Sequence, residues 1–586
     1  MIYYFITKQK WGGSMNFTTK TENQVEFEEI KQIKSGEISE YLVKIVFKEK
    51  ASPSKYTISW EEPQIDMLGF WSSKCVTQYN LTPDWFPRKE ESRTASGMPL
   101  ITIYSGSGKN RLSVALSDPS SPSTISAGVV EENGALIIKI DLFSKICSSI
   151  KEYEAIIRID RREVPFYQAI KDARGWWSDL GYAPMYVPAS AKLPMYSTWY
   201  SFHQKTIPDE ILYECKIAKE YGMDTVIVDD GWQTDDNRRG YAFCGDWEVC
   251  ENKIPDMKKF VDDVHALGMK FMIWFSVPFV GLESKIYDRF KGMYLLTRQG
   301  SRASVLDPRF KEVRDYLTNI YASSVEKYGW DGLKLDFIDS FELSDEESSR
   351  DFEKMDTVSL EEGLQLLLSE TVEKLKKINP EIMIEFRQSY VGPAISKYGN
   401  IFRVGDCPAD PINNRVGSLS LRLSSDTTAV HSDMIMWNNN DTNESVLYQL
   451  LGTMFAVPQI SVRFDTITFD HKKLLKSYLS FWREHSDVIL NGELKVYDPD
   501  ASFSLAKSKK DGECVAVLYR GVVEKIENDV LEYVFNATGK NDIYIESEEN
   551  RTYEIYDIFG EKYATGKIAS GVNKIPAKNC EMVKII

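Results

Sequence analysis

The stretch Leu333-Lys334-Leu335-Asp336-Phe337-Ile338 alternates apolar and polar residues like a short β-strand and carries a carboxylate towards its end. A second run of this kind, Phe402-Arg403-Val404-Gly405-Asp406, follows later in the chain and also ends on a carboxylate. Cleavage of a glycosidic bond requires two carboxylates in one cleft. A fold that brings these two strand ends together would supply that pair.

The two runs belong to a series of eight short apolar runs that alternate with amphipathic helical segments between residues 194 and 484. Eight strand-then-helix repeats favour a (β/α)8 TIM barrel. A doubly wound parallel sheet is the alternative, but no glycine-rich phosphate turn follows the first run. The apolar runs are 195–202, 225–232, 270–275, 332–338, 382–389, 402–406, 430–437 and 459–464, and clear helical segments are 209–221, 257–267, 310–328 and 360–378.

On both sides of this region the hydrophobic period changes to two, which is typical of β-strands. Residues 16–185 alternate in this way and are broken by Gly, Pro, Ser and Asn clusters, with a helical connector at 164–180. Alternating strands return after residue 491. We therefore predict three domains: an N-terminal β-supersandwich with its connector at 1–185, a catalytic barrel at 186–488 and a C-terminal antiparallel β-sandwich at 489–586.

Composition limits the partners and the compartment. The formal net charge of -16 argues against nucleic acid or an anionic membrane as a partner, because both require a basic surface. The eight cysteines form no CxxC pair, which favours reduced thiols in a cytoplasmic protein, with a Cys244–Cys250 disulfide as the alternative. The N-terminal apolar run is too short for a signal peptide, and Met15 is an alternative start to Met1.

In a barrel the active site lies at the carboxyl ends of the strands, and polar residues gather there in this sequence. Lys334 and Asp336 are two residues apart, so both point into the barrel, and a buried ammonium would keep Asp336 ionised, as a nucleophile requires. The adjacent acids Asp229 and Asp230 repel each other unless each has a partner. A lone Asp beside a strand more often caps a helix or turn, as we expect for Asp331 and Asp339. Other polar or aromatic residues at strand ends are Trp232, Trp274, Glu385, Arg387, Arg403, Asp406, His431, Asp433 and Trp437.

Other hydrolytic chemistries lack their motifs. The chain has five histidines, none at metal-ligand spacing, and no HExxH sequence. It has no G-x-S-x-G nucleophile elbow. We therefore predict carboxylate chemistry without a metal or a cofactor.

At these residues the chain resembles the retaining α-galactosidases of glycoside hydrolase family 36, in the clan that includes family 27. Lys334-Leu335-Asp336 is similar to the family's nucleophile strand, and Val404-Gly405-Asp406 lies where its acid/base motif belongs. The resemblance spans most of the length. Its further elements are Asp229-Asp230-Gly231-Trp232, Gly245-Asp246-Trp247, Lys253-Ile254-Pro255, Gly268-Met269-Lys270, Trp274 and Ala429-Val430-His431.

The chain departs from the family pattern at three places. Ser276-Val277-Pro278-Phe279 replaces the family's E-P-E-M, and Phe386-Arg387-Gln388-Ser389-Tyr390 replaces its C-x-G-G-G-R. After Asp406 comes Cys407-Pro408-Ala409-Asp410, in which the second acid is one residue later than in the family. We therefore expect a divergent subgroup with a changed subsite around Arg387 and Cys407.

The resemblance implies an exo-acting α-galactosidase that removes terminal α-galactosides from oligosaccharides by double displacement. Asp336 is the expected nucleophile and Asp406 the expected acid/base, with Asp410 as the alternative. Retention predicts carboxyl groups roughly 5–5.5 Å apart, against roughly 6.5–9.5 Å for inversion. In the family, the equivalents of Asp229 and Asp230 bind the galactose 4- and 6-hydroxyls. The remaining expected substrate-binding residues are Lys334, Arg387, Arg403, Asp246 and Cys407, with Trp199, Trp232, Trp247 and Trp274 as aromatic contacts.

Two other classes of function stay open at this point. Within enzymes, the same carboxylates suit an α-N-acetylgalactosaminidase, another α-glycosidase or a galactosyltransferase of the raffinose-synthase type. Outside enzymes, the alternative is a sugar-binding protein that has lost activity, which the intact Asp336 and Asp406 argue against. The large N-terminal domain could also present a surface for a homo-oligomer.

Overall fold

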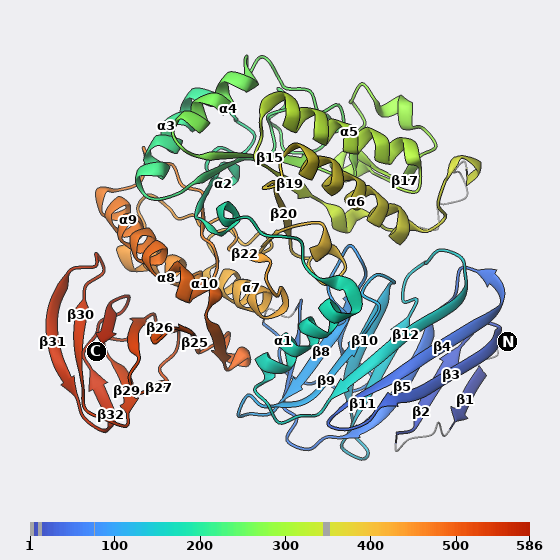
Figure 1. The fold of residues 1–586 in the computed structure, drawn as a ribbon, viewed down its shortest axis with the longest axis horizontal. Coiled ribbons are helices and arrows are strands. Elements are labelled where there is room, and N and C mark those ends of the chain that lie inside the picture. The colour runs from blue at the N-terminus through green and yellow to red at the C-terminus, as the bar shows by residue number, and fades with distance from the viewer. Residues whose placement is uncertain (1–4, 10–14, 75–76, 344–351) are drawn as a thin grey trace.

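A computed structural model of the chain describes residues 5–9, 15–74, 77–343 and 352–586. Its centre is an eight-stranded parallel sheet rolled into a nearly closed barrel (Figure 1). The strand order is β22-β21-β20-β19-β15-β14-β13-β23, and two isolated bridges, His431–Val457 and Ile435–Ile460, connect its ends. The strands are β13 (Met195–Ser197), β14 (Thr225–Val228), β15 (Lys270–Ser276), β19 (Gly332–Asp336), β20 (Met383–Arg387), β21 (Ile401–Arg403), β22 (Ala429–His431) and β23 (Gln459–Ile460). The predicted TIM-barrel class is confirmed.

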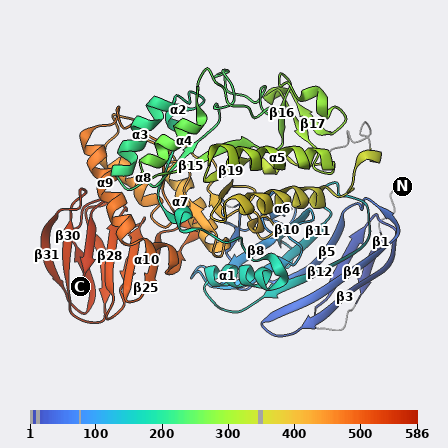
Figure 2. The same cartoon turned by 45° about the horizontal axis from the view of Figure 1, so that its top comes forward.

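Helices surround this barrel, as Figures 1 and 2 show. In α6 (Leu360–Ile378) the buried residues Leu360, Leu364, Leu367 and Leu368 recur with helical spacing, and the side chain of Ser359 caps the first turn. The predicted helical segments match α3 (Pro208–Glu220), α4 (Met257–Ala266), α5 (Lys311–Tyr328) and α6. Further along the chain lie α7 (Pro411–Ser424), α8 (Asn443–Gly452), α9 (Phe469–Glu484) and α10 (Ser486–Asn491).

Seven of the eight barrel strands end earlier than the predicted runs, most clearly in runs 195–202 and 430–437, and one sheet was not predicted. Run 195–202 divides into β13 and a short helix, α2 (Trp199–Phe202), and run 430–437 keeps only β22 as a strand. A continuous apolar run does not distinguish a buried strand from a buried turn of helix. Between β15 and α5 the chain forms a three-stranded sheet of β16 (Phe279–Gly281), β18 (Ala303–Leu306) and β17 (Tyr294–Arg298).

The N-terminal region is a sandwich of two six-stranded sheets, as predicted. In β4 every second residue from Ser39 to Phe47 is buried, which is the period expected of a half-buried strand. Helix α1 (Phe166–Trp177) then leads to the barrel. The first sheet contains β1 (Phe5–Gln9), β2 (Phe17–Thr21), β5 (Tyr56–Pro63), β11 (Ala135–Leu142), β10 (Ser123–Val130) and β7 (Arg88–Ser92). The second contains β3 (Val25–Lys34), β4 (Ile38–Ala51), β12 (Ile150–Asp160), β9 (Asn110–Leu116), β8 (Leu100–Tyr104) and β6 (Gly69–Ser72).

The C-terminal region is a smaller, mainly antiparallel β-domain with its own apolar core. Two pairs, β26–β28 and β27–β29, are parallel, which the predicted antiparallel sandwich did not include. The larger sheet has β24 (Glu493–Tyr497), β25 (Leu505–Lys510), β26 (Glu513–Leu518), β28 (Leu531–Asn536), β33 (Met582–Ile585), β30 (Arg551–Tyr556) and β31 (Lys562–Ile568). The smaller has β27 (Val523–Lys525), β29 (Ile543–Ser547) and β32 (Gly571–Ile575). We propose domain boundaries at 185 and 488.

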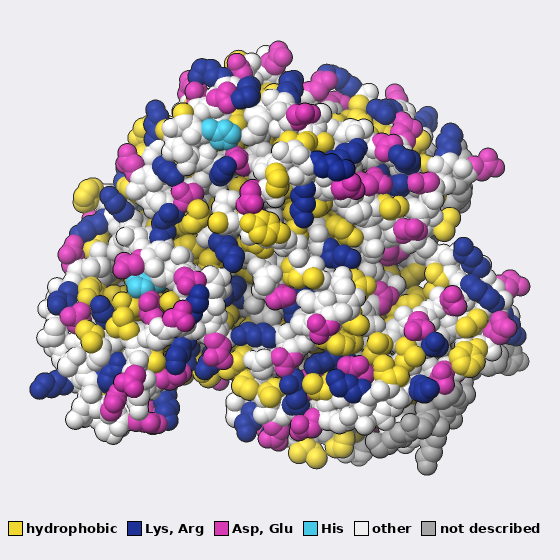
Figure 3. Space-filling model, in the orientation of Figure 1, with side chains coloured by type: hydrophobic (Ala, Val, Ile, Leu, Met, Phe, Trp, Pro, Cys, Tyr) yellow, Lys and Arg dark blue, Asp and Glu magenta, His cyan; other side chains and the backbone are white. Residues whose placement is uncertain are grey.

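Within the described ranges, no helix is both long and apolar enough to cross a bilayer. Cys244 and Cys250 are both free thiols, so the disulfide alternative is wrong. On the face drawn in Figure 3, acidic and basic side chains are interspersed.

Candidate active site

The inward face of the barrel changes from apolar to polar along each strand. Near the amino ends, six strands contribute apolar side chains to one cluster that closes this end of the barrel. Because side chains two residues apart share a face, the next inward positions are the polar ones at the carboxyl ends. The cluster residues Met195, Ile227, Met272, Met383, Ile401 and Ala429 are followed on the same face by residues that include Asp229, Trp274, Glu385, Arg403 and His431. The polar residues of the site therefore lie directly above this apolar cluster, towards the carboxyl ends of the strands.

Asp336, at the end of β19, is held by four donors. Its Oδ1 accepts from Arg387 Nε at 2.7 Å, Tyr390 Oη at 2.9 Å and the backbone N of Phe337 at 2.7 Å. Its Oδ2 accepts from Trp274 Nε1 at 3.0 Å. Burial raises the pKa of Asp336, but the charges of Arg387 and Lys334 outweigh this effect and hold the pKa below its usual value. Asp336 is therefore an ionised carboxylate, and Oδ2, with one donor, is its less occupied oxygen.

The neighbouring acids Asp229 and Asp230 have different partners, which solves the repulsion between them. Lys334 Nζ lies 2.5 Å from Asp229 Oδ2, and both side chains are buried. Asp230 instead accepts from Gln204 Nε2 and Gln233 Nε2, each at 2.7 Å. Burial raises the pKa of Asp230 to about 6, because its amide partners carry no charge. Lys334 thus pairs directly with Asp229 and acts on Asp336 through its charge.

Arg403, at the end of β21, is shared by three carboxylates. Its guanidinium contacts Asp433, lies 3.3 Å from Glu385 Oε1 and donates from Nη2 to Asp406 Oδ1 at 2.9 Å. The side chains of Arg403, Glu385 and Asp433 are almost completely buried. Burial raises the pKa of both Glu385 and Asp433, and Arg403 opposes that rise in each. Arg403 therefore organises the strand-end acids.

Asp406 and Asp410 occupy different environments. The side chain of Asp406 is 52% exposed, and its pKa, which burial raises, is brought below the usual value by Arg403 and Lys334, while Asp336 raises it. Asp410 caps α7: its Oδ1 accepts from the backbone N of Ile412 at 3.1 Å and of Asn413 at 3.0 Å. Asp406 is thus close enough to Asp336 for their charges to interact, whereas Asp410 has a structural task at a helix N-terminus.

The predicted tryptophans fall into two groups. Trp274 contacts Asp336, and Trp199 in α2 is partly exposed and stacks on the His203 ring at 3.8 Å between centroids. Trp232 has no exposed surface, donates from Nε1 to the Trp274 carbonyl at 2.8 Å and stacks on the buried Trp247. Trp232 therefore lies behind Trp274 and supports it, and its expected contact with the sugar stays a prediction.

Asp246 and Cys407 also contact other protein groups. Asp246 accepts from the backbone N of Lys285 at 3.0 Å and of Ile286 at 3.1 Å, which fixes the loop after β16. The backbone N of Cys407 donates to Asp433 Oδ2 at 2.7 Å. Cys407 thus joins the site through its backbone, and Asp246 anchors a loop.

Sequence reasoning missed the site residues that come from loops and from the N-terminal domain. Tyr390 follows the end of β20 on a loop, and Tyr200 in α2 donates to Asp433 Oδ2 at 3.0 Å. No hydrophobic period marks such positions. For Tyr390, the only sequence signal is the replaced glycine-rich stretch that contains it.

The N-terminal sandwich holds the loops that follow Asp336 and Arg387. Arg93 donates to the carbonyl of Asp339 at 2.8 Å and to that of Phe341. The backbone N of Gly97 donates to the carbonyl of Ser389 at 2.8 Å. These contacts are between residues more than two hundred positions apart, so sequence periodicity could not have indicated them.

Chemically, the site combines one ionised, well-held carboxylate with one half-exposed carboxylate and several hydrogen-bonding groups. Among the described residues, no cluster of three or more His, Cys, Asp or Glu side chains is arranged to hold a metal ion. The arrangement can supply a nucleophile, a proton donor and acceptors for hydroxyl groups.

Comparison with known proteins gives matches to one group of enzymes. The melibiase family model matches residues 194–401. α-Galactosidase Mel36A of Lactobacillus acidophilus is 33% identical over 155 residues, which is 24% of this chain and 19% of that protein. α-Galactosidase AgaA of Geobacillus stearothermophilus is 29% identical over 148 residues, 23% of this chain and 19% of that protein. The matched part spans about a fifth of the length of these curated relatives.

The similarity in three dimensions is more extensive. The crystal structure of the α-galactosidase from Lactobacillus brevis aligns with a TM-score of 0.64 at 14% identity, covering 100% of this chain and 84% of that chain. The family 36 α-galactosidase AgaA in complex with stachyose aligns with a TM-score of 0.61 at 13% identity, covering 97% of this chain and 82% of that chain. At such identities these alignments concern the fold.

Proposed function

We propose that this chain, which is similar to the α-galactosidases of glycoside hydrolase family 36, hydrolyses terminal α-galactosides of oligosaccharides with retention of configuration. The observation that carries the proposal is the state of Asp336, a buried carboxylate kept ionised by Arg387 and Lys334 at a barrel strand end. Raffinose and stachyose, which are bound in solved structures of AgaA, are the natural substrates to test.

In the first step, Asp336 Oδ2 attacks the anomeric carbon, and Asp406 donates a proton to the glycosidic oxygen as the leaving group departs. Arg403 and Lys334 favour the ionised form of Asp406 in the free protein, so Asp406 must take up a proton from solvent before this step. In the second step, Asp406 takes a proton from water, which attacks the same carbon and releases Asp336. Arg387 and Tyr390 hold Oδ1, so the attacking oxygen keeps one orientation. We infer that Asp229, Asp230 and Trp274 bind the sugar.

Hydrolysis of p-nitrophenyl α-galactoside tests this proposal, beside the matching α-N-acetylgalactosaminide, α-glucoside and β-galactoside. We expect release from the α-galactoside above the other three, with α-galactose as the first product seen by proton NMR. β-Galactose as the first product would contradict retention. Preference for another α-glycoside would move the assignment to that sugar, and no release from any of the four would favour the sugar-binding alternative.

The pKa of Asp230 predicts how activity depends on pH. The ionised carboxylate accepts hydrogen bonds from sugar hydroxyls, so protonation below about pH 6 should weaken binding and lower kcat/KM as the pH falls. We expect kcat/KM of the wild type to fall as the pH drops below about 6. In Asp230→Asn we expect kcat/KM to be low at every pH and not to show this fall.

Stability provides an independent check on the same group. The folded protein binds the proton of the Asp230 carboxyl more tightly than the unfolded chain does, and this difference stabilises the fold. The stabilisation is complete below the pKa of the carboxyl in the unfolded chain. It is lost as the pH rises through about 6. The difference in Tm between Asp230→Asn and the wild type should therefore move in favour of the variant with rising pH. A pH-independent difference would show that Asp230 does not titrate in this range.

A further inference from the structure

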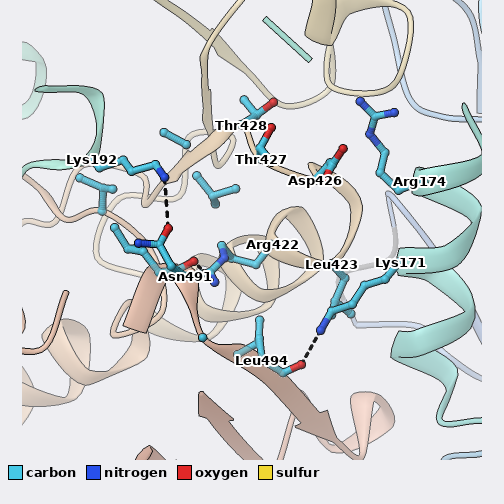
Figure 4. A pocket seen from close by; sticks show the side chains of 16 residues that line it. Lys171, Arg174, Lys192, Arg422, Leu423, Asp426, Thr427, Thr428, Asn491 and Leu494 are labelled. Carbon is cyan, nitrogen blue, oxygen red and sulfur yellow. Dashed lines mark hydrogen bonds between the residues drawn. The ribbon is translucent and has the colours of Figure 1, made fainter. Parts of the chain in front are cut away.

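A cavity lies where the three parts of the chain meet, at the amino ends of the barrel strands. Its volume is about 390 Å³, and it is lined by α1, by the end of α7 with the segment leading into β22, and by residues 490–494 between α10 and β24 (Figure 4). Asp336 is at the carboxyl end of its strand, so this cavity is on the opposite face of the barrel. Cavities of this size hold small ligands.

The lining is strongly basic. Four cationic side chains, Lys171, Arg174, Lys192 and Arg422, face a single acidic one, Asp426, which is exposed and accepts from Ser178. The cations come from three separate segments of the chain, and Figure 4 shows Lys192 and Arg422 reaching towards Asn491. Gathering four like charges around one hollow is unfavourable unless an anion joins them.

Among the described residues, neither arginine forms an ion pair with a carboxylate, and both donate to neutral oxygens. Arg422 donates to the carbonyls of Phe455, Ile489 and Leu490, at 2.6, 3.0 and 2.8 Å. Burial lowers the pKa of Arg422 to about 10, and no neighbouring charge opposes this effect. Arg174 donates to the Tyr182 carbonyl and to Ser396. Burial lowers its pKa to about 10 as well, with only Asp426 opposing.

Donors without partners also line the cavity. The Oγ1 of Thr428 and the Nε of Arg174 have no hydrogen-bond partner, and both residues are buried, at 4% and 1% exposed. Lys171 makes one bond, to the Leu494 carbonyl at 2.7 Å, and Lys192 makes one, to Asn491 Oδ1 at 3.1 Å. An ammonium group has three hydrogens, so each lysine can donate further. A ligand with several acceptor oxygens would take the free hydrogens of the two ammonium groups.

We propose that this cavity binds a phosphate group, either free phosphate or the phosphate of a sugar monoester. A phosphate is compact, carries up to two negative charges and offers several acceptor oxygens, which matches ammonium, guanidinium and hydroxyl donors gathered in one hollow. A purely structural role explains part of the basic lining, because Arg422 and Lys171 donate to backbone carbonyls. It leaves the Thr428 hydroxyl and Arg174 Nε without partners, and it does not explain why Lys192 joins the other cations. The site is separate from Asp336, so its occupation does not depend on the glycosidase proposal.

Titration of the full-length chain with orthophosphate at constant ionic strength tests the site, with sodium chloride as the reference. We expect a saturable rise in Tm of about 2 °C and binding measurable by calorimetry. The double variant Lys171→Gln/Lys192→Gln should weaken phosphate binding by about tenfold or more. Lys171→Arg/Lys192→Arg should keep it, and Lys31→Gln, at an exposed strand position of the N-terminal sandwich, should bind like the wild type.

Glucose 6-phosphate and galactose 1-phosphate distinguish the two sources of the phosphate. Tighter binding of either ester than of orthophosphate identifies a sugar phosphate, and equal or weaker binding identifies free phosphate. The proposal is overturned if phosphate and chloride shift Tm equally. It is also overturned if the glutamine double variant, shown to be folded by circular dichroism, binds phosphate as tightly as the wild type.

Discussion

Asp336→Asn is expected to lower kcat on p-nitrophenyl α-galactoside by about 10³-fold or more while leaving a folded protein that still binds galactose. The amide is nearly the same size as the carboxylate, but it is a poor nucleophile and cannot form the glycosyl ester. Its oxygen can still accept from Arg387 and Tyr390, so the loop after β20 keeps its anchor. Steady-state kinetics and galactose calorimetry measure the two effects separately.

Asp339→Asn is the matched control for this variant. Asp339 lies on the same loop and is 3.8 Å from Arg387 Nη1, so it experiences the same cation without contacting the predicted anomeric centre. We expect its kcat to stay within about tenfold of the wild type, because a long ion pair contributes little. If Asp336→Asn lost no more activity than Asp339→Asn, Asp336 would not be the nucleophile.

The second large effect concerns Asp406. Asp406→Ala should reduce hydrolysis of raffinose by about 10²–10⁴-fold, since its leaving group needs a proton, and should affect p-nitrophenyl α-galactoside less. Azide can then replace water in the second step and attack the covalent intermediate from the same face. We expect azide to restore turnover and to give α-galactosyl azide.

Two further variants make this assignment sharp. In Asp336→Ala no covalent intermediate forms, so azide would attack from the face of the missing nucleophile and give β-galactosyl azide. Asp410→Asn keeps a side chain that can cap α7 and should retain near-normal hydrolysis without azide. The acid/base role would belong to Asp410 under two results. Asp410→Asn would lose activity and give α-galactosyl azide when azide is added, and Asp406→Ala would keep normal activity.

The barrel and much of its floor could be predicted because strand periodicity is a local property of the sequence. Lys334 and Asp336 share a face through their spacing alone, and the alternation in β19 places both inside the barrel. The same rule pointed to Glu385 and Asp433, although their common partner Arg403 became clear only in three dimensions.

What could not be predicted depends on tertiary contacts. Trp232 follows a strand end, as a residue lining the site would, yet it packs into the aromatic core because the backbone turns at Gly231, whose φ is 113°. Tyr390 reaches Asp336 from a loop, and Arg93 reaches the loop after β19 from another domain. Neither position carries a periodic signal.

The hydrogen bonds from Arg93 and Gly97 to loops beside Asp336 and Arg387 have an evolutionary consequence. A sandwich that merely flanked the barrel could be exchanged for another without affecting the chemistry. Here the sandwich sets the backbone of two loops whose residues meet the nucleophile, so substitutions at 93–97 and at 339–341 or 389 must remain compatible. A recombinant protein that joined this barrel to an unrelated sandwich would keep the carboxylates. It would lack the hydrogen bonds from residues 93 and 97 that position the neighbouring loops.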